Sequence, residues 1–253
     1  MQIAKLLKGK KDCKFMNKLF ISSSSTSQTK IMSLTNLLYS DIEEADFSKN
    51  ENAFTNYVNK YFQLRYHEFS SNTELIFANI TLFRSSWQSN EGSDPVATFY
   101  NSFNYTHDNK YECRLLEMPL SSEFKLILLL PNEADVLHTL FTTLSDRGLS
   151  AAVNSVQPLF TAKAKLKAPI IDYLSKVEVK ENIGAIGDGS AVQYGDIDVS
   201  EKGIRVKVLT CFYSPKITRM ETDKQISHAP VSPVYFAVVF KDTPIFIGNL
   251  NRN

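Results

Sequence analysis

The residues that could act as nucleophiles or general bases are few, and they do not form a catalytic pattern. The chain of 253 residues contains four histidines. The segment Gly187-Asp-Gly-Ser190 lacks the spacing of a nucleophile elbow and falls in a turn-like stretch. His107-Asp108 lies among asparagines, so turn chemistry explains it better than catalysis. Because a hydrolase needs a nucleophile, a base and an orienting group, we expect no catalytic residue and no enzyme activity.

The three cysteines, Cys13, Cys113 and Cys211, are far apart and show no metal-ligand spacing. An odd number without a framework favours free thiols in a reducing compartment. We therefore expect neither a metal site nor a cofactor. Cys211 is better explained as a small buried hydrophobic residue than as a reactive thiol.

Overall charge gives no general attraction to nucleic acid or to an anionic membrane. Lys and Arg (28) nearly balance Asp and Glu (27), leaving a net charge of +1. Charged residues interrupt the first twelve positions, so no apolar run of signal-peptide length is present there. We expect a cytoplasmic protein, with secretion as the alternative.

The elements that would position any site are mostly strands. Residues 15–21, 75–83, 111–118, 124–130 and 162–168 have strand patterns, and 234–240 with 245–250 predicts a final hairpin. Apolar residues at helical spacing over 54–62 predict an amphipathic helix, and Ser48 with Glu51 predicts its capping box. The pattern indicates one α+β domain over 1–253, rich in antiparallel sheet.

Several of these segments, in this order, resemble the serpin family. The stretch from Asn79 to Trp87 is similar to the family's "NAIYFKGKW" strand, with Asn79, Phe83 and Trp87 at matching positions. Near the C-terminus, Pro233 and Gly248 match the "PFLFAI" and "FLG" segments. The resemblance implies a serpin-like fold with helices packed on central antiparallel sheets. Because typical members begin earlier, it also implies an N-terminally shortened chain that lacks the family's first helices.

The resemblance also predicts a reactive loop at about 204–226. In the family, an attacking protease cleaves this loop and is trapped when the loop's N-terminal half inserts into the main sheet. The family's hinge pattern "E-x-G-T-E-A-A-A-A-T" aligns with residues 201–210, and the ends match. The hinge residues on this alignment are Glu201, Gly203, Ile204, Val206, Val208 and Thr210.

Two interpretations of this stretch compete. Branched side chains where the family has alanine would overfill the slot and slow insertion, although Ile204, Val206 and Val208 could face the core while Arg205 and Lys207 faced water. Alternatively, 196–210 is a permanent strand of the sheet. The family's spacing implies a scissile bond near Ile217-Thr218, with neighbouring residues also plausible. Its candidates are Lys216, Ile217, Thr218, Arg219 and Met220.

The resemblance therefore implies a protease-inhibitor homologue with a degenerate hinge, weak or non-inhibitory, whose role would be that of a decoy or of a protein that interacts with a host protease. One alternative is a functional serine or cysteine protease inhibitor that acts by loop insertion. Another is an interaction scaffold without a protease target. A compact member without a visible signal peptide also resembles intracellular and poxvirus serpins.

The N-terminal lysines fall where heparin-binding serpins carry a basic helix. They are Lys5, Lys8, Lys10, Lys11, Lys14 and Lys18. A solvated basic surface explains them better than a sulfated polysaccharide does, because no export signal is visible, so glycosaminoglycan binding is not expected. The expected partner is a protease or another protein.

Overall fold

The computed structural model describes the strands of two large sheets and the segments that lie against them. The described residues are 7, 9–22, 40–49, 51–62, 64–69, 73–88, 98–101, 104–108, 113–131, 142–144, 148, 164–167, 171–179, 182–183, 187–188, 190–214, 217–222 and 234–250.

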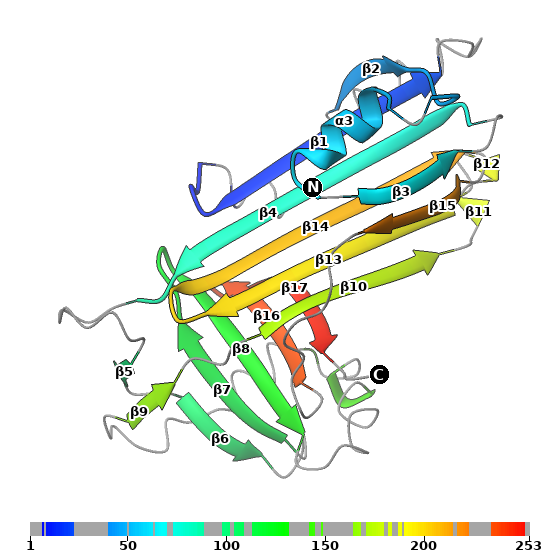
Figure 1. Ribbon diagram of the computed structural model, residues 1–253. Helices are drawn as coiled ribbons and strands as arrows, with labels where there is room; N and C mark the ends of the chain where they lie inside the picture. Colours follow the sequence, from blue (N-terminus) through cyan, green and yellow to red (C-terminus); the bar gives the residue numbers. More distant parts are fainter. Residues whose placement is uncertain are drawn as a thin grey trace.

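The first sheet has six strands, and we call it the main sheet (Figure 1). In spatial order it contains β10 (Ile171–Val179), β13 (Ser190–Ser200), β14 (Gly203–Ser214), β4 (Leu75–Ser86), β1 (Cys13–Ser22) and β2 (Asp41–Ala45). All neighbouring strands are antiparallel except β1 and β2, which are parallel.

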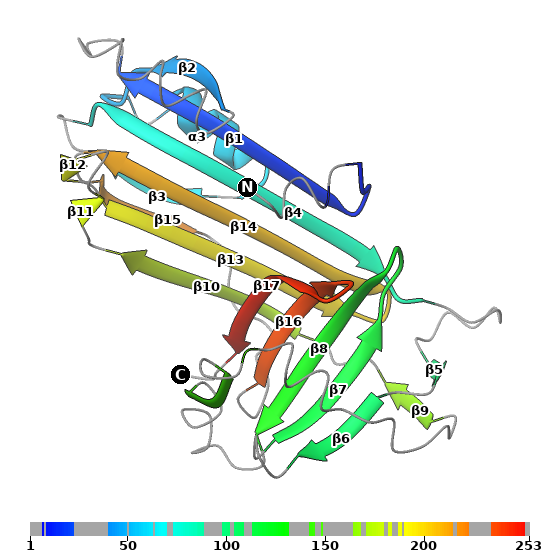
Figure 2. The same ribbon diagram turned by 180° about the vertical axis from the view of Figure 1, so that it is seen from behind.

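The second sheet has five strands and lies across one end of the main sheet (Figure 2). In spatial order it contains β17 (Thr243–Leu250), β16 (Val234–Phe240), β8 (Phe124–Pro131), β7 (Cys113–Pro119) and β6 (Asn104–Asp108). The predicted C-terminal hairpin is confirmed, with its turn at Lys241 and Asp242.

Three two-stranded sheets complete the strand set. They pair β15 (Ile217–Thr222) with β3 (Leu64–Phe69), β5 (Thr98–Asn101) with β9 (Ala164–Lys167), and β11 (Asn182–Ile183) with β12 (Gly187–Asp188). The prediction that His107 and Asp108 lie in a turn is wrong. Both belong to β6, where they pair with Arg114 and Cys113 of β7.

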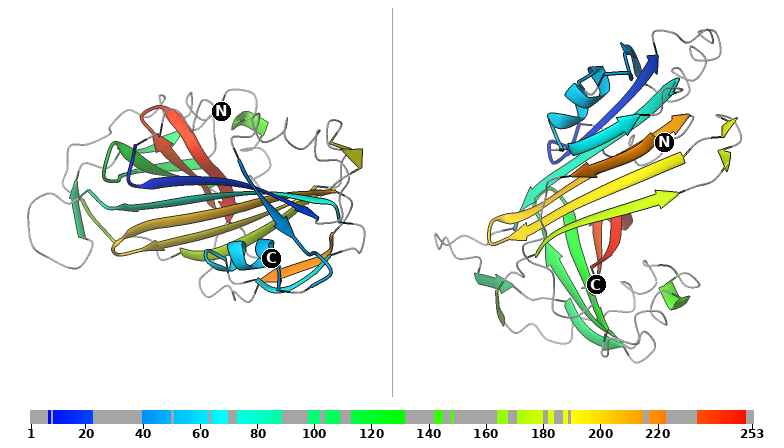
Figure 3. Two further views of the ribbon diagram at one scale, coloured as in Figure 1. Left: turned by 90° about the horizontal axis from the view of Figure 1, so that it is seen from above. Right: turned by 45° about the vertical axis from the view of Figure 1, so that its right-hand side comes forward.

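Helix α3 (Ala53–Asn59) lies on one face of the main sheet, and the five-stranded sheet lies on the other (Figure 3). The predicted helix therefore exists, but its cap differs. Asn52 is the N-cap, and its side chain and that of Thr55 form the capping box. Ser48 instead donates to the Asp46 carboxylate outside the helix. Within the described ranges, no helix is long and apolar enough to cross a bilayer.

The two largest apolar cores among the described residues follow from the alternation of side chains along the strands. One core fills the space between the two large sheets and contains Phe83, Phe124, Val238 and Phe246. The other lies beneath α3 and contains Phe20, Phe54 and Val58. Strand β4 contributes to both cores, which explains why its sequence is a nearly continuous apolar run.

Candidate functional site

The stretch that the sequence predicted as the start of an exposed loop is instead a central strand. All of 203–214 forms β14, which is hydrogen-bonded to β13 on one side and β4 on the other. The expectation of a loop from 204 is thus corrected for the residues up to Ser214. These residues form a strand because apolar and basic side chains alternate along them, a pattern that suits a strand within a sheet. The same pattern was the basis for the alternative prediction of a permanent strand over 196–210.

A two-residue turn at Glu201 and Lys202 joins β13 to β14, with Ser200 opposite Gly203. Gly203 has φ of 146°, a conformation that residues with a side chain rarely adopt. A Cβ atom there would lie 2.1 Å from the Ser85 carbonyl oxygen of β4. Trp87 fixes the other side of the turn, because its indole Nε1 donates to the Ser200 carbonyl at 2.9 Å. The turn therefore requires glycine at 203.

Each half of β14 buries a different face. In the first half, Ile204 and Val206 are buried in the core between the sheets, with Val208 packed against that core. In the second half, Leu209 and Cys211 are fully buried on the opposite face, in the core beneath α3. The branched side chains that were expected to overfill the slot are therefore accommodated as core residues.

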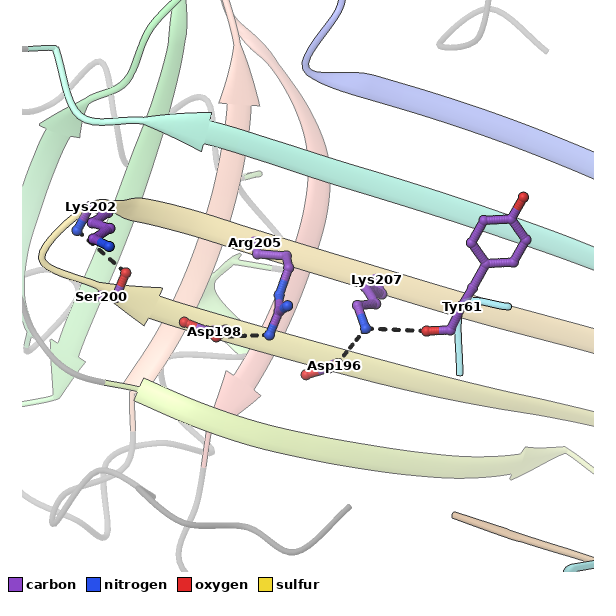
Figure 4. Close-up of polar contacts among 7 residues, drawn as sticks. All are labelled: Tyr61, Asp196, Asp198, Ser200, Lys202, Arg205 and Lys207. Carbon is purple, nitrogen blue, oxygen red and sulfur yellow. Dashed lines mark hydrogen bonds and ion pairs between the residues drawn. The ribbon is translucent and has the colours of Figure 1, made fainter. Parts of the chain in front are cut away.

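Charged residues on β14 lie directly opposite carboxylates on β13 (Figure 4). Arg205 is the partner of Asp198, with an N–O distance of 2.8 Å. Lys207 is the partner of Asp196, with an N–O distance of 3.6 Å. Its Nζ also donates to the Tyr61 carbonyl at 3.1 Å, beyond the C-terminal end of α3. Arg205 is exposed as expected, but the Lys207 side chain is only 25% exposed and does not simply face water.

Asp196 and Asp198 were not among the site residues predicted from the sequence, although the sequence contains a signal for them. Asp198 and Arg205 are each three residues from the turn pair Glu201-Lys202, and Asp196 and Lys207 are each five residues from it. In a two-residue hairpin, positions equidistant from the turn lie opposite each other. Without the hairpin assignment, this symmetry cannot be recognised.

Of the scaffold positions matched to the family, Asn79 and Phe83 lie in β4, next to β14, and Gly248 lies in β17 of the five-stranded sheet. Asn79 donates from Nδ2 to Asn17 Oδ1 at 2.6 Å, and Phe83 makes an edge contact with Phe124. A Cβ on Gly248 would lie 2.6 Å from the Phe236 ring, so glycine permits close packing in the hairpin. Pro233 lies outside the described residues.

The scissile-bond candidates follow β14 along the chain. Residues 217–220 belong to β15, where Ile217 is opposite Phe69, Arg219 opposite Glu68, and Met220 opposite His67, with an irregularity at Thr218. Lys216 lies outside the described residues. The backbone of this segment is therefore paired with the strand that follows α3.

Burial or ion pairs account for Cys211 and for two of the N-terminal lysines that the sequence suggested as candidate sites. Burial raises the pKa of the Cys211 thiol far above its ordinary value, so its reactive thiolate is suppressed in this conformation. Lys10 pairs with Glu123, and Lys18 pairs with Glu43. No group of histidine, cysteine or acidic side chains among the described residues could hold a metal ion.

No protein-family model and no curated protein matches this sequence. Solved structures do match. A cleaved serpin 42Da has a TM-score of 0.72 at 18% identity, covering 100% of this chain and 79% of that one. Tengpin, a thermophilic serpin in the latent state, has a TM-score of 0.67 at 13% identity, covering 94% and 75% of the chains. Reaction-loop-cleaved lamprey angiotensinogen has a TM-score of 0.63 at 15% identity, covering 79% and 74%. The chain has the serpin fold.

Proposed function

We propose that this chain is a serpin-family protease-inhibitor homologue that does not trap proteases, because its insertion strand already occupies the main sheet. The observation that carries the proposal is the position of β14 between β13 and β4, where both of its edges are paired. On this proposal Glu201 lies in the hinge turn, and the other hinge residues, Gly203 to Thr210, belong to the inserted strand.

The physical argument is one of stored free energy. Trapping by insertion needs an exposed loop whose entry into the sheet is both fast and strongly favourable. When the strand is already paired on both sides and its apolar side chains are already buried, cleavage further along the chain releases no additional burial. A protease that cleaves the segment after β14 would therefore complete hydrolysis and leave.

The proposed partner is a serine or cysteine protease, or another protein that recognises the surface around β15. Arg219 would suit a protease with trypsin-like specificity. Proteases bind their substrates as extended chains, and the β15 backbone is already paired with β3. We therefore expect slow cleavage here, which fits a binding or decoy role better than that of an efficient substrate.

The test is to incubate the intact protein with trypsin and, separately, with a papain-type protease, and to examine the products under denaturing conditions. We expect no covalent protease adduct. We also expect cleavage within residues 215–233 to change the melting temperature by less than about 2 °C, because less than about 1 kcal/mol is gained. An adduct that survives detergent, or a large rise in melting temperature, would contradict the proposal and support the inhibitor alternative.

A further inference from the structure

The ion pairs between β13 and β14 form two consecutive rungs on one face of the sheet. Asp198 lies opposite Arg205, and Asp196 lies opposite Lys207. On its other side, Arg205 is opposite the exposed Arg84 of β4. Because like charges directly opposite each other destabilise a sheet, the Asp198 carboxylate is what makes this position favourable for an arginine.

The two pairs specify a single register of β14. A slip of one residue would turn every β14 side chain to the opposite face. A slip of two residues in one direction places Lys207 opposite Tyr194, and in the other direction it places Leu209 opposite Asp196. Only the observed register pairs both cations with carboxylates, because each two-residue slip leaves one such pair, Arg205 with Asp196 or Lys207 with Asp198.

Lys207 links this register to helix α3. The last turn of α3 contains no basic residue, and the Lys207 ammonium from β14 donates to the Tyr61 carbonyl just beyond the helix. Leu209 and Cys211 of the same strand share a core with Phe54 and Val58 of α3. A helix of this length is unstable alone, so its position depends on the strand beneath it.

We infer that Asp196, Asp198, Arg205 and Lys207 form an ionic lock that holds β14 in the main sheet and couples its insertion to the docking of α3. This inference rests on the proposed function, because it explains what keeps the strand inserted. The lock acts as a conformational device: weakening it increases the population in which β14 has left the sheet and α3 has lost its support.

The experiment measures how fast Cys211 reacts with a thiol reagent in the native protein, with labelled peptides identified by mass spectrometry. Cys211 is fully buried while β14 is inserted. We expect Asp198→Arg alone and Arg205→Asp alone to increase the labelling rate of Cys211 about tenfold, as a loss of about 1.4 kcal/mol would do. Lys207→Met should have a similar effect and should also speed amide exchange in α3.

The double variant Asp198→Arg with Arg205→Asp restores the pair with its charges reversed, so its labelling rate should return to the wild-type value or below. Lys14→Met is the matched control, because Lys14 is an exposed lysine of the neighbouring strand β1. That control should leave the Cys211 rate unchanged. Cys113, buried in β7, reports on the rest of the fold in every variant.

Three results would overturn the lock. The first is an unchanged labelling rate of Cys211 in the single variants, and the second is a double variant that does not restore the protection of Cys211. The third is an equal increase in the labelling rate of Cys113, which would mean that the pairs stabilise the whole fold. A failure of the proposed function has a different signature. In that case Cys211 of the wild-type protein would react as fast as it does in urea.

Discussion

At the scale of single residues, the turn before β14 is held by one backbone conformation and one hydrogen bond. Gly203 brings the backbone so close to Ser85 that a methyl group has no room, and Trp87 ties the other strand end through the Ser200 carbonyl. The hairpin requires glycine at 203, and Trp87 supports it through this hydrogen bond. The sequence matched Gly203, Asn79, Phe83 and Trp87 to family positions, but the reason for a glycine at 203 is a contact with a strand more than a hundred residues away, which no local pattern contains.

Replacing Gly203 with alanine should destabilise the folded state by about 3 kcal/mol, from the positive φ and the overlap with the Ser85 carbonyl together. Urea unfolding measures this loss. Gly9→Ala is the matched control, because Gly9 also has a positive φ, of 85°, but nothing lies within 4 Å of the added methyl group. That control should lose about 1 kcal/mol. Equal losses at the two sites would show that the close approach to β4 has no energetic consequence.

At the scale of elements, α3 and β14 share one apolar core. Periodicity alone identified the helix, the buried strand β4 and the C-terminal hairpin, because each has a clear pattern of apolar residues. The predicted helix cap was wrong. Ser48 and Glu51 have the spacing of a capping box, but the Ser48 hydroxyl donates to the Asp46 carboxylate instead. It also left β14 open between a loop and a strand, because an inserted strand and an insertable loop share one pattern.

Replacing Asn52 with alanine should weaken α3 by about 1 kcal/mol, because it removes the acceptor for the Thr55 amide. Amide exchange in residues 54–59 should accelerate about fivefold, as that loss implies. Ser48→Ala is the matched control suggested by the sequence pattern, and we expect it to leave exchange in α3 nearly unchanged. If Ser48→Ala had the larger effect, the cap would lie where the sequence placed it.

At the scale of the whole molecule, two large sheets share an apolar core, and α3 covers the outer face of one of them. Composition and strand spacing indicated an α+β domain rich in antiparallel sheet, and the serpin fold confirms that class. The spatial order of the strands could not be derived in the same way. β14 pairs with β4, so that Thr210 lies opposite Asn79. Which strands so distant in sequence pair with each other depends on the burial of whole faces of the sheet.

The central claim is that β14 occupies the main sheet before any cleavage, and amide hydrogen exchange of the intact chain tests it most directly. Intact mass should first establish that no bond has been cut. We then expect the amides of 204–213 in β14 to be protected to the same degree as those of 76–85 in β4, because β14 is paired on both sides over this range and β4 is paired on both sides as far as Phe83. Exchange of 204–213 at the rate of an unstructured peptide, with 76–85 still protected, would contradict the account.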